Sequence, residues 1–289
     1  MAEATQVDFF AGRRAVIATM HGKEAVIGPL LEQATGLRTF PVVGMDTDRF
    51  GTFTLEVDRR GNQLEAARAK ARAALALTAA DLAIASEGSF GPHPQVPWMV
   101  SGRELVVLLD PYHGVELVGQ VLTTKTNCDQ AVVATWAEAQ AFADRVGFPS
   151  HGLVVRSGAK ADSAVAAKGV ADAASYEAVI RQALAQAGDG RILVETDMRA
   201  HLNPTRMAAI GEATRDLLRV MQALCPTCRR PGYVVVEIVP GLPCAWCARA
   251  TRQPLSARFR CRGCGMEEVR LYPDGATKAD PGRCDSCNP

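Results

Sequence analysis

Short apolar runs alternate with amphipathic segments over the first 224 residues. The apolar runs have the length of β-strands, and the amphipathic segments repeat with the 3.6-residue period of helices. The runs predict strands at residues 15–20, 39–43, 51–56, 81–85, 104–109, 115–122, 153–156 and 191–195. The amphipathic segments predict helices at residues 24–35, 62–77, 130–146, 175–187 and 204–224. Strands that alternate with helices in this way favour an α/β fold with a mixed sheet.

Capping residues support several of these boundaries. Gly36 can end the first helix, Asn62 can cap the second, and Pro204 suits the first turn of the last. The polar residues 86–89 predict a turn at the end of the strand before them. Residues 157–174 predict a loop or short elements.

Eight of the nine cysteines form four Cys-x-x-Cys pairs in the last 65 residues. Two sulfurs from one tight turn can bind the same ion, and a second pair completes a tetrahedron, so eight thiolates suit two structural zinc ions. A redox pair would open a helix after a strand, and a disulfide framework would need an oxidising compartment; the sequence indicates neither. The pairs are Cys225/Cys228, Cys244/Cys247, Cys261/Cys264 and Cys284/Cys287.

The way in which the four pairs share two ions stays open at this point. Sequential pairing joins the first two pairs and the last two, across ribbon-like spacers of 15 and 19 residues, and we favour it. Nested pairing joins the second pair with the third and the first with the fourth. Either way, a closed four-sulfur site has no open coordination position, so it folds the tail and catalyses nothing. We expect an α/β domain at residues 1–224 and a double zinc ribbon at residues 225–289.

Length and composition restrict the class of protein. A chain of 289 residues suits one large domain and one small one, and 48% hydrophobic with 22% charged residues is an ordinary soluble composition. No apolar run reaches the roughly 18 residues of a membrane span. Asp8 and Arg13 interrupt any signal-peptide pattern at the N-terminus. We therefore expect a cytoplasmic protein without membrane contact.

The net charge of +1 is divided unevenly along the chain. Residues 225–289 hold ten Arg or Lys and six Asp or Glu, and the rest holds 22 and 25. Basic zinc modules often contact nucleic acid, and Trp246 with the arginines after it could stack on bases and bind phosphates. Two four-thiolate zinc sites each carry about −2, which cancels the basic excess. Charge alone therefore does not decide for nucleic acid.

Three polar segments follow apolar strands, which is where open α/β folds bind ligands. The first holds Thr19, His21 and Lys23 in a turn between a strand and a helix. Amides at the helix N-terminus and the Lys23 ammonium could hold a phosphate there. The turn lacks the P-loop pattern, and the alternative is a solvated lysine in a first helical turn.

The second segment holds Ser86 and Glu87, and Glu65 lies on the helix before it. Two carboxylates that converge on a phosphate are what a magnesium-dependent hydrolase needs. The alternative makes Glu65 a charge on the helix surface and Glu87 a turn residue.

The third segment, residues 195–206, joins an apolar strand to the last helix. Its two arginines could bind a phosphate through paired donors, and either of its acids could hold a metal ion. The alternative is a capping and salt-bridge cluster that stabilises the helix. The polar residues of the segment are Glu195, Asp197, Arg199, His201, Asn203 and Arg206.

The order of these segments resembles the inosine-triphosphatase-like fold of nucleotide pyrophosphatases. Residues 19–23 occupy the place of that family's Thr/Ser-x-x-x-Lys-like turn, residues 65–67 are similar to its Glu-x-Ala helix, and residues 86–88 to its Ile-Glu-Gly-like turn. The insertion around residues 147–190 and the cysteine-rich tail lie outside that fold. The whole chain resembles a bacterial family with such an N-terminal domain, the signature at residues 195–207 and a zinc tail.

The resemblance implies roles for individual residues. Lys23 would hold phosphate, and Arg206 would contact base or phosphate. Glu65 and Glu87 would bind Mg²⁺ or Mn²⁺ or activate water.

Two functions of different classes follow. The first is metal-dependent hydrolysis of a nucleotide phosphoanhydride, on a non-canonical or modified nucleoside triphosphate, which needs mainly positioning and charge neutralisation. The alternative is a non-catalytic protein that binds a nucleotide or nucleic acid and uses the ribbons to contact a partner. In a third interpretation, the ribbons are only a structural cap or a homodimer surface.

Overall fold

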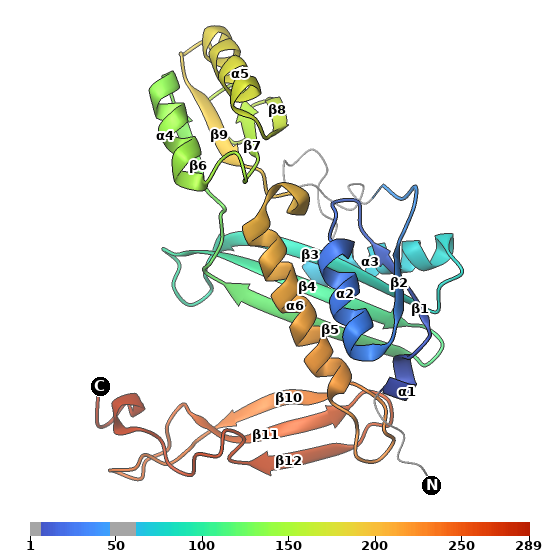
Figure 1. Ribbon diagram of the computed structural model, residues 1–289. Coiled ribbons are helices and arrows are strands. Elements are labelled where there is room, and N and C mark those ends of the chain that lie inside the picture. Colours follow the sequence, from blue (N-terminus) through green and yellow to red (C-terminus); the bar gives the residue numbers. More distant parts are fainter. Residues whose placement is uncertain (1–6, 47–61) are drawn as a thin grey trace.

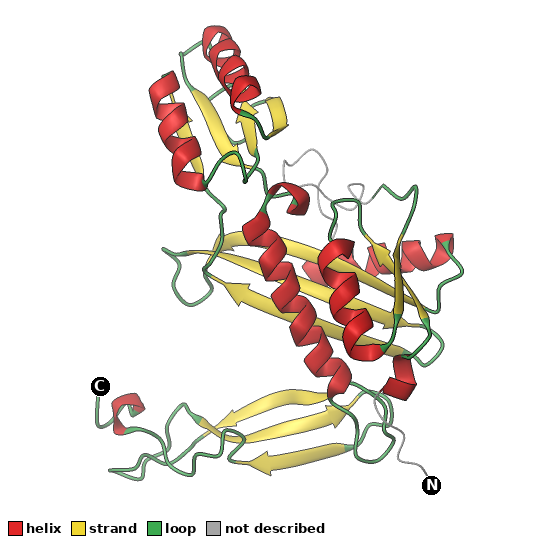
Figure 2. Cartoon of the chain, in the orientation of Figure 1, coloured by secondary structure: helices red, strands yellow, loops and turns green. Residues whose placement is uncertain are grey.

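Three β-sheets follow one another along the length of the molecule in the computed structural model (Figure 1). The structure describes residues 7–46 and 62–289. Helices pack on the first two sheets, whereas the third carries none along its strands (Figure 2). This mixed α/β architecture confirms the expected fold class. The expected strand at residues 51–56 lies outside the described residues.

The first sheet is mixed, with the order β2-β1-β3-β4-β5. Strand β1 pairs in parallel with β2 and β3, and the antiparallel strands β3, β4 and β5 complete the sheet. The strands are β1 (Arg14–Ala18), β2 (Arg38–Pro41), β3 (Leu82–Pro92), β4 (Val100–Asp110) and β5 (Val115–Thr123).

Alternating side chains of these strands form a separate core on each face of the sheet. Helices α2 (Glu24–Thr35) and α6 (Pro204–Gln222) cover one face, and the short helix α1 (Val7–Phe10) lies at the edge of this core. Helix α3 (Gln63–Leu77) covers the other, where its alanines meet Val16, Ala83 and Leu105. The small side chains of α3 let the helix approach the strands closely.

The expected caps form at three helix ends. Gly36 ends α2 with a φ of 70° in the left-handed region. The Asn62 side chain accepts a hydrogen bond from the Glu65 amide at the start of α3, and Pro204 stands in the first turn of α6.

One expectation for the first sheet is wrong. Residues 86–89 do not form a turn but continue β3, and Glu87 pairs with Leu105 in the middle of the hairpin. The antiparallel register runs without interruption from Ala83–Leu109 to Pro92–Val100, so pairing with β4 outweighs the local turn preference of Ser and Gly.

A second α/β unit is inserted between β5 and α6. Its antiparallel sheet has the order β6-β9-β7-β8, and α4 and α5 pack on it around the buried side chains of Phe142, Tyr176 and Ile180. Its elements are β6 (Gln130–Val133), α4 (Trp136–Val146), β7 (Leu153–Arg156), β8 (Val165–Val170), α5 (Ala173–Gln186) and β9 (Ile192–Thr196).

The insertion is therefore larger than the expected residues 147–190. The expected helix at 130–146 is wrong over its first turn, because residues 130–133 pair with β9 as strand β6. The helix begins only after Thr135, whose hydroxyl accepts a hydrogen bond from the Glu138 amide.

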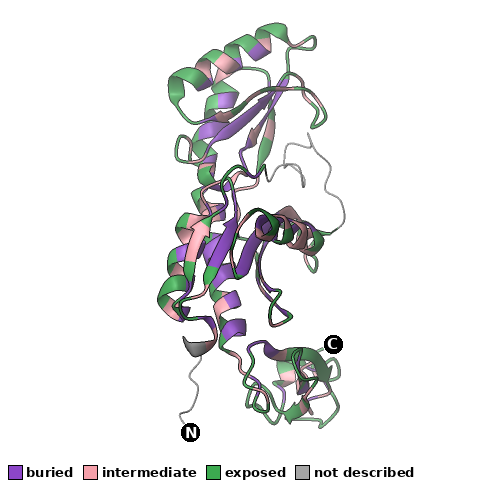
Figure 3. Ribbon diagram, turned by 90° about the vertical axis from the view of Figure 1, so that its right-hand side faces the viewer, coloured by how far each residue is buried: buried purple, intermediate pink, exposed green. Residues whose placement is uncertain are grey.

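The third sheet contains β10 (Tyr233–Pro240), β11 (Pro254–Cys261) and β12 (Glu267–Leu271) in antiparallel order. Figure 3 shows that buried residues concentrate in the first two sheets, whereas the third is mostly exposed. No helix in the described part of the chain combines the length and the hydropathy needed to cross a membrane. The division of the chain at residue 224 stays a prediction.

Helix α6 lies directly against the backbone of β5 at Gly119. A Cβ atom on this residue would lie 2.5 Å from Leu217 Cα, and closer still to Leu217 N and Ala213 O. All three are backbone atoms of α6, so no side-chain rotation can make room. The absence of a side chain at Gly119 thus sets the separation of helix and sheet.

We expect Gly119→Ala to lower the free energy of unfolding by about 3 kcal/mol, because the helix must move away from the sheet. Urea unfolding followed by circular dichroism measures this loss. Gly188→Ala is the matched control, since a Cβ at this exposed residue meets no atom within 4 Å. Equal effects of the two substitutions would contradict the packing argument.

Candidate functional site

A cavity of about 490 Å³ opens between the first sheet and the inserted unit. The β1–α2 turn, the β3–β4 hairpin and strands of the inserted unit contribute to its lining. Its acidic residues are Glu87, Asp129, Glu195 and Asp197. Its basic residues are Lys23, Lys70, Arg156, Lys168, Arg199 and Arg206. The cavity lining thus carries more positive than negative groups.

All three polar segments singled out in the sequence reach this cavity. Those of their residues that line it are Thr19, His21, Lys23, Glu87, Glu195, Asp197, Arg199 and Arg206. Ser86, His201 and Asn203 lie nearby without lining it, and Glu65 is exposed on the start of α3. The fold therefore brings together segments that are far apart in the sequence.

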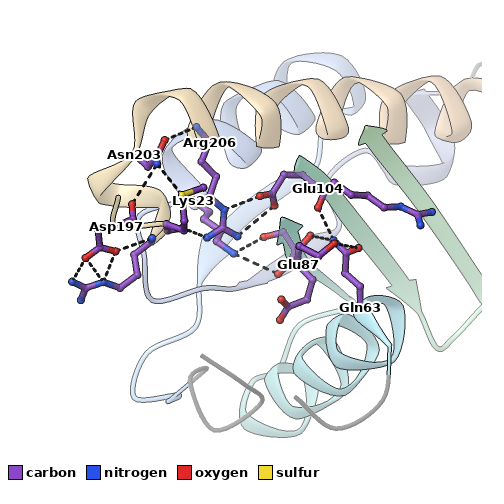
Figure 4. Close-up of polar contacts among 12 residues, drawn as sticks. Lys23, Gln63, Glu87, Glu104, Asp197, Asn203 and Arg206 are labelled. Carbon is purple, nitrogen blue, oxygen red and sulfur yellow. Dashed lines mark hydrogen bonds and ion pairs between the residues drawn. The ribbon is translucent and has the colours of Figure 1, made fainter. Parts of the chain in front are cut away.

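A buried ion pair joins the first turn of α6 to β4. Arg206 Nε donates to Glu104 Oε1 at 2.7 Å, and Arg206 Nη1 donates to the Met198 carbonyl (Figure 4). Asn203 caps the helix, because its Oδ1 accepts from the Arg206 amide at 3.0 Å. Gly88 leaves room for the pair, since a Cβ there would lie 2.6 Å from Arg206 Nη2. Glu104 neutralises the arginine that the resemblance assigns to base or phosphate.

Glu87 forms a second ion pair, with Lys70 of α3. Both side chains are almost fully buried. The side-chain Nε2 of Gln63 donates at 2.7 Å to the Glu87 carbonyl and at 2.8 Å to the Arg103 carbonyl. A divalent cation at the Glu87 carboxylate would have to displace the Lys70 ammonium.

Glu65 lies at the start of α3 as a helix cap. Its carboxylate accepts a hydrogen bond from the Asn62 amide at 2.9 Å, and the side chain is exposed. The expected convergence of Glu65 and Glu87 on one phosphate is therefore wrong as a description of this structure, because Glu65 is absent from the cavity lining. In residues 7–46 and 62–289, three or more potential metal ligands gather only at cysteine clusters.

Lys23 occupies the N-cap position of α2, in the turn that follows β1. Its side chain is 7% exposed, and its Nζ atom donates to Ser86 Oγ at 3.1 Å. Among the described residues, no carboxylate lies within ion-pair distance of this ammonium. Burial and then the charge of Arg206 lower the pKa of Lys23 from 10.5 to about 7, so amine and ammonium coexist at neutral pH.

The acids Glu195, at the end of β9, and Asp197, just after it, are also paired. Glu195 Oε2 lies 2.5 Å from Arg156 Nε, and Asp197 Oδ2 lies 2.6 Å from Arg199 Nη2. Asp197 accepts a further hydrogen bond from the Gly169 amide at 3.1 Å. The sequence allowed either a ligand site or a capping and salt-bridge cluster at residues 195–206. The contacts are those of a salt-bridge cluster, and the same residues also line the cavity.

Histidines from two segments meet beside the cavity. The rings of His21 and His201 stack with their centroids 5.2 Å apart. His21 lies in the β1–α2 turn, and His201 lies in the short helix η2 (Ala200–Leu202). Thr19 Oγ1 accepts from the His21 amide at 3.3 Å and so helps to fix the turn.

Two aromatic residues of the β3–β4 hairpin line the cavity and were not predicted from the sequence. Trp98 and Phe90 line the cavity, and Trp98 is 84% exposed. A tryptophan in a proline-rich segment was the feature of the sequence that could have indicated this site. Lys70 was also missed, although it lies among the alanines on the buried face of α3.

The eight paired cysteines form two clusters of four. In each cluster, the sulfur atoms all lie within 4.8 Å of one another, and the measured pairs are 3.6–3.8 Å apart. A tetrahedral zinc ion with bonds of about 2.3 Å separates its sulfurs by about 3.8 Å. Each cluster could therefore hold one structural zinc ion. The clusters are Cys225, Cys228, Cys261, Cys264 and Cys244, Cys247, Cys284, Cys287.

The pairing is neither sequential nor nested: the first pair joins the third, and the second joins the fourth. The sequential expectation is wrong because β10 and β11 are antiparallel, with Tyr233 opposite Cys261, which brings the third pair back to the first. A bridge from Cys244 to Ala279 brings the last pair to the second in the same way. Spacer lengths do not contain this information.

We expect the purified protein to carry two zinc ions, and Cys225→Ala/Cys264→Ala to retain one of them. Both substitutions fall in one cluster, whereas sequential or nested pairing would place them in different sites and remove both ions. Zinc content by mass spectrometry of the metal measures the difference. Cys225→Ala/Cys244→Ala is the control, which should lose both ions.

We expect Lys23→Met to stabilise the protein by about 2 kcal/mol at pH 6, because it removes a buried charge. The unfolded chain keeps Lys23 protonated up to its usual pKa of 10.5, whereas the folded chain releases the proton near pH 7. The penalty is therefore complete below pH 7 and fades as the pH rises toward 10.5. Urea unfolding at about pH 6 and about pH 9 should show this difference shrinking.

Lys70→Met is the matched control, because it removes the ammonium that pairs with the buried Glu87 carboxylate and should destabilise the protein. A gain for Lys23→Met that does not depend on pH would contradict the assignment.

Comparison with known families gives a match over most of the chain. A family model described as a domain of unknown function, DUF6671, matches residues 70–289. The match includes the cavity residues from Lys70 onward and both cysteine clusters. No curated protein matches the chain. Because the match spans more than half of its residues, the chain belongs to the DUF6671 family.

Proposed function

We propose that this protein binds a small phosphate-bearing ligand of the nucleotide class in the cavity between the first sheet and the inserted unit. The observation that carries the proposal is the set of six basic side chains that line one cavity together with an exposed tryptophan. Phosphate groups bind to clustered Lys and Arg donors, and a base stacks on an aromatic ring.

The charges of the cavity support an anion better than a metal ion. Glu87, Glu195 and Asp197 each accept a basic side chain from Lys70, Arg156 or Arg199. Because these acids already have basic partners, and basic side chains outnumber acidic ones in the lining, a negatively charged ligand fits the cavity better than a cation.

Hydrolysis of a phosphoanhydride is the finer form of this proposal. Its support is the resemblance to nucleotide pyrophosphatases and the presence of Lys23 and Glu87 in the cavity lining. Mg²⁺ usually keeps several waters and takes only one or two protein carboxylates besides the phosphates of its substrate. Glu87 could serve in this way only after release from Lys70. Binding is therefore the function that the geometry supports best.

We also propose that residues 225–289 form a zinc-stabilised domain. Its small core packs Tyr233 against Cys225 and Cys261 of the first cluster. Its arginines give less support to nucleic acid, because Arg258 and Arg260 form ion pairs with Glu237 and Glu267 of the same sheet.

We expect nucleoside triphosphates to bind, and Trp98→Ala to weaken binding about tenfold, since loss of one stacked base costs ~1–3 kcal/mol. Calorimetry with adenosine, guanosine, inosine and xanthosine triphosphates, with and without Mg²⁺ or Mn²⁺, measures affinity. Pyrophosphate release from the same samples decides between an enzyme and a binding protein.

The control is Trp246→Ala, which removes a tryptophan that is 79% exposed in the second cysteine cluster. Equal losses from both substitutions, or no binding of any nucleotide to the zinc-loaded protein, would refute the proposed ligand.

A further inference from the structure

Lys23 differs from the other buried cations around the cavity in its partners. Arg206 is neutralised by Glu104, and Lys70 by Glu87, whereas Lys23 meets the neutral hydroxyl of Ser86. Figure 4 shows Lys23, Glu87, Glu104 and Arg206 near the first turn of α6. A buried lysine without a carboxylate partner is costly for folding, and groups of this kind are frequent at functional sites.

We propose that Lys23 forms an imine with a small aldehyde or ketone that also carries a phosphate group. This inference rests on the anion-binding cavity of the proposed function, and it adds a covalent step to that site. Lys23 lines the cavity, so a ligand inside it can reach the side chain, and the remaining basic residues of the lining can hold the phosphate.

The surroundings of Lys23 favour the amine over the ammonium at neutral pH. Burial and the charges of Arg206 and Lys70 disfavour protonation, and the charges of Glu104 and Glu87 oppose this effect only in part. The resulting pKa is about 7. A lysine in a desolvated position next to other cations is activated as a nucleophile, because only the neutral amine has a free electron pair.

The step balances without an oxidant or a reductant. The nitrogen lone pair of Lys23 attacks the carbonyl carbon, and a proton moves from nitrogen to the former carbonyl oxygen to give a carbinolamine. The carbinolamine then loses its hydroxyl group as water, with the remaining nitrogen proton, to leave a carbon–nitrogen double bond. Hydrolysis reverses the sequence.

Reductive trapping on the full zinc-loaded chain tests the proposal. The probe is pyridoxal 5′-phosphate, an aldehyde with a phosphate group, and sodium borohydride reduces any imine to a stable secondary amine. Peptide mass spectrometry then reports the rate at each lysine. The internal references are Lys70, Lys125, Lys160, Lys168 and Lys278.

We expect Lys23 to be modified at least about tenfold faster at pH 7 than any exposed lysine, because a far larger fraction of it is the free amine. The Lys23 rate should rise with pH to a plateau above about pH 7, and inorganic phosphate should slow it by competition. Lys23→Met should lose this fast modification while remaining folded. Modification of Lys23 no faster than of exposed Lys125 and Lys278 would refute the imine.

Nucleotide binding to the same sample separates this inference from the proposed function. Nucleotides that bind to a protein whose Lys23 resists the aldehyde would refute the imine and support the proposed function. Fast trapping at Lys23 with no nucleotide bound would support the imine and refute the nucleotide as ligand.

Discussion

The direct packing of α6 on β5 is the constraint on which the rest of the structure depends. At Gly119 the backbones of helix and strand approach with no side chain between them. The first turn of α6 holds Arg206 at the cavity, and the chain after its last turn enters the cysteine clusters at Cys225. One helix thus relates all three sheets, and its position on the first sheet fixes where the cavity and the first cluster lie.

The buried ion pairs of the site also hold its helices and strands in one arrangement. Desolvation makes a buried ion pair a weak source of stability, but breaking it leaves an unpaired charge at high cost. The pairs of Arg206 with Glu104 and Lys70 with Glu87 therefore hold α6, α3 and the β3–β4 hairpin in one arrangement. Lys23 lies within this rigid frame and takes its unusual titration from it.

The sequence was sufficient where local chemistry decides the structure. Helix α2, its end at Gly36, the cap at Asn62 and the start of α6 at Pro204 all depend on neighbouring residues, and each lies where the pattern predicts it. The course of residues 86–92 could not be predicted in this way. Their Ser, Gly and Pro residues favour a turn, and only pairing with a strand that comes later in the chain makes them extended.

The same distinction applies to the candidate site. Residue types identified the three polar segments, and the spacing of cysteines identified the candidate metal ligands. Partners across the fold could not be read from the sequence, because Glu104 and Lys70 look like ordinary strand and helix residues until the sheet forms. These partners decide which charges are neutralised, and therefore which side chain remains reactive.

The crossed order of the cysteine pairs has a consequence for how the tail forms. A chain emerging from the ribosome has both of its first two pairs exposed before either can complete a tetrahedron, and the first cluster closes only when Cys264 appears. Until then a bound ion would be held by two sulfurs from each of two pairs that belong to different final sites. Pairing of β10 with β11 brings Cys261 and Cys264 to Cys225 and Cys228, so strand pairing as well as the metal would favour the correct partners.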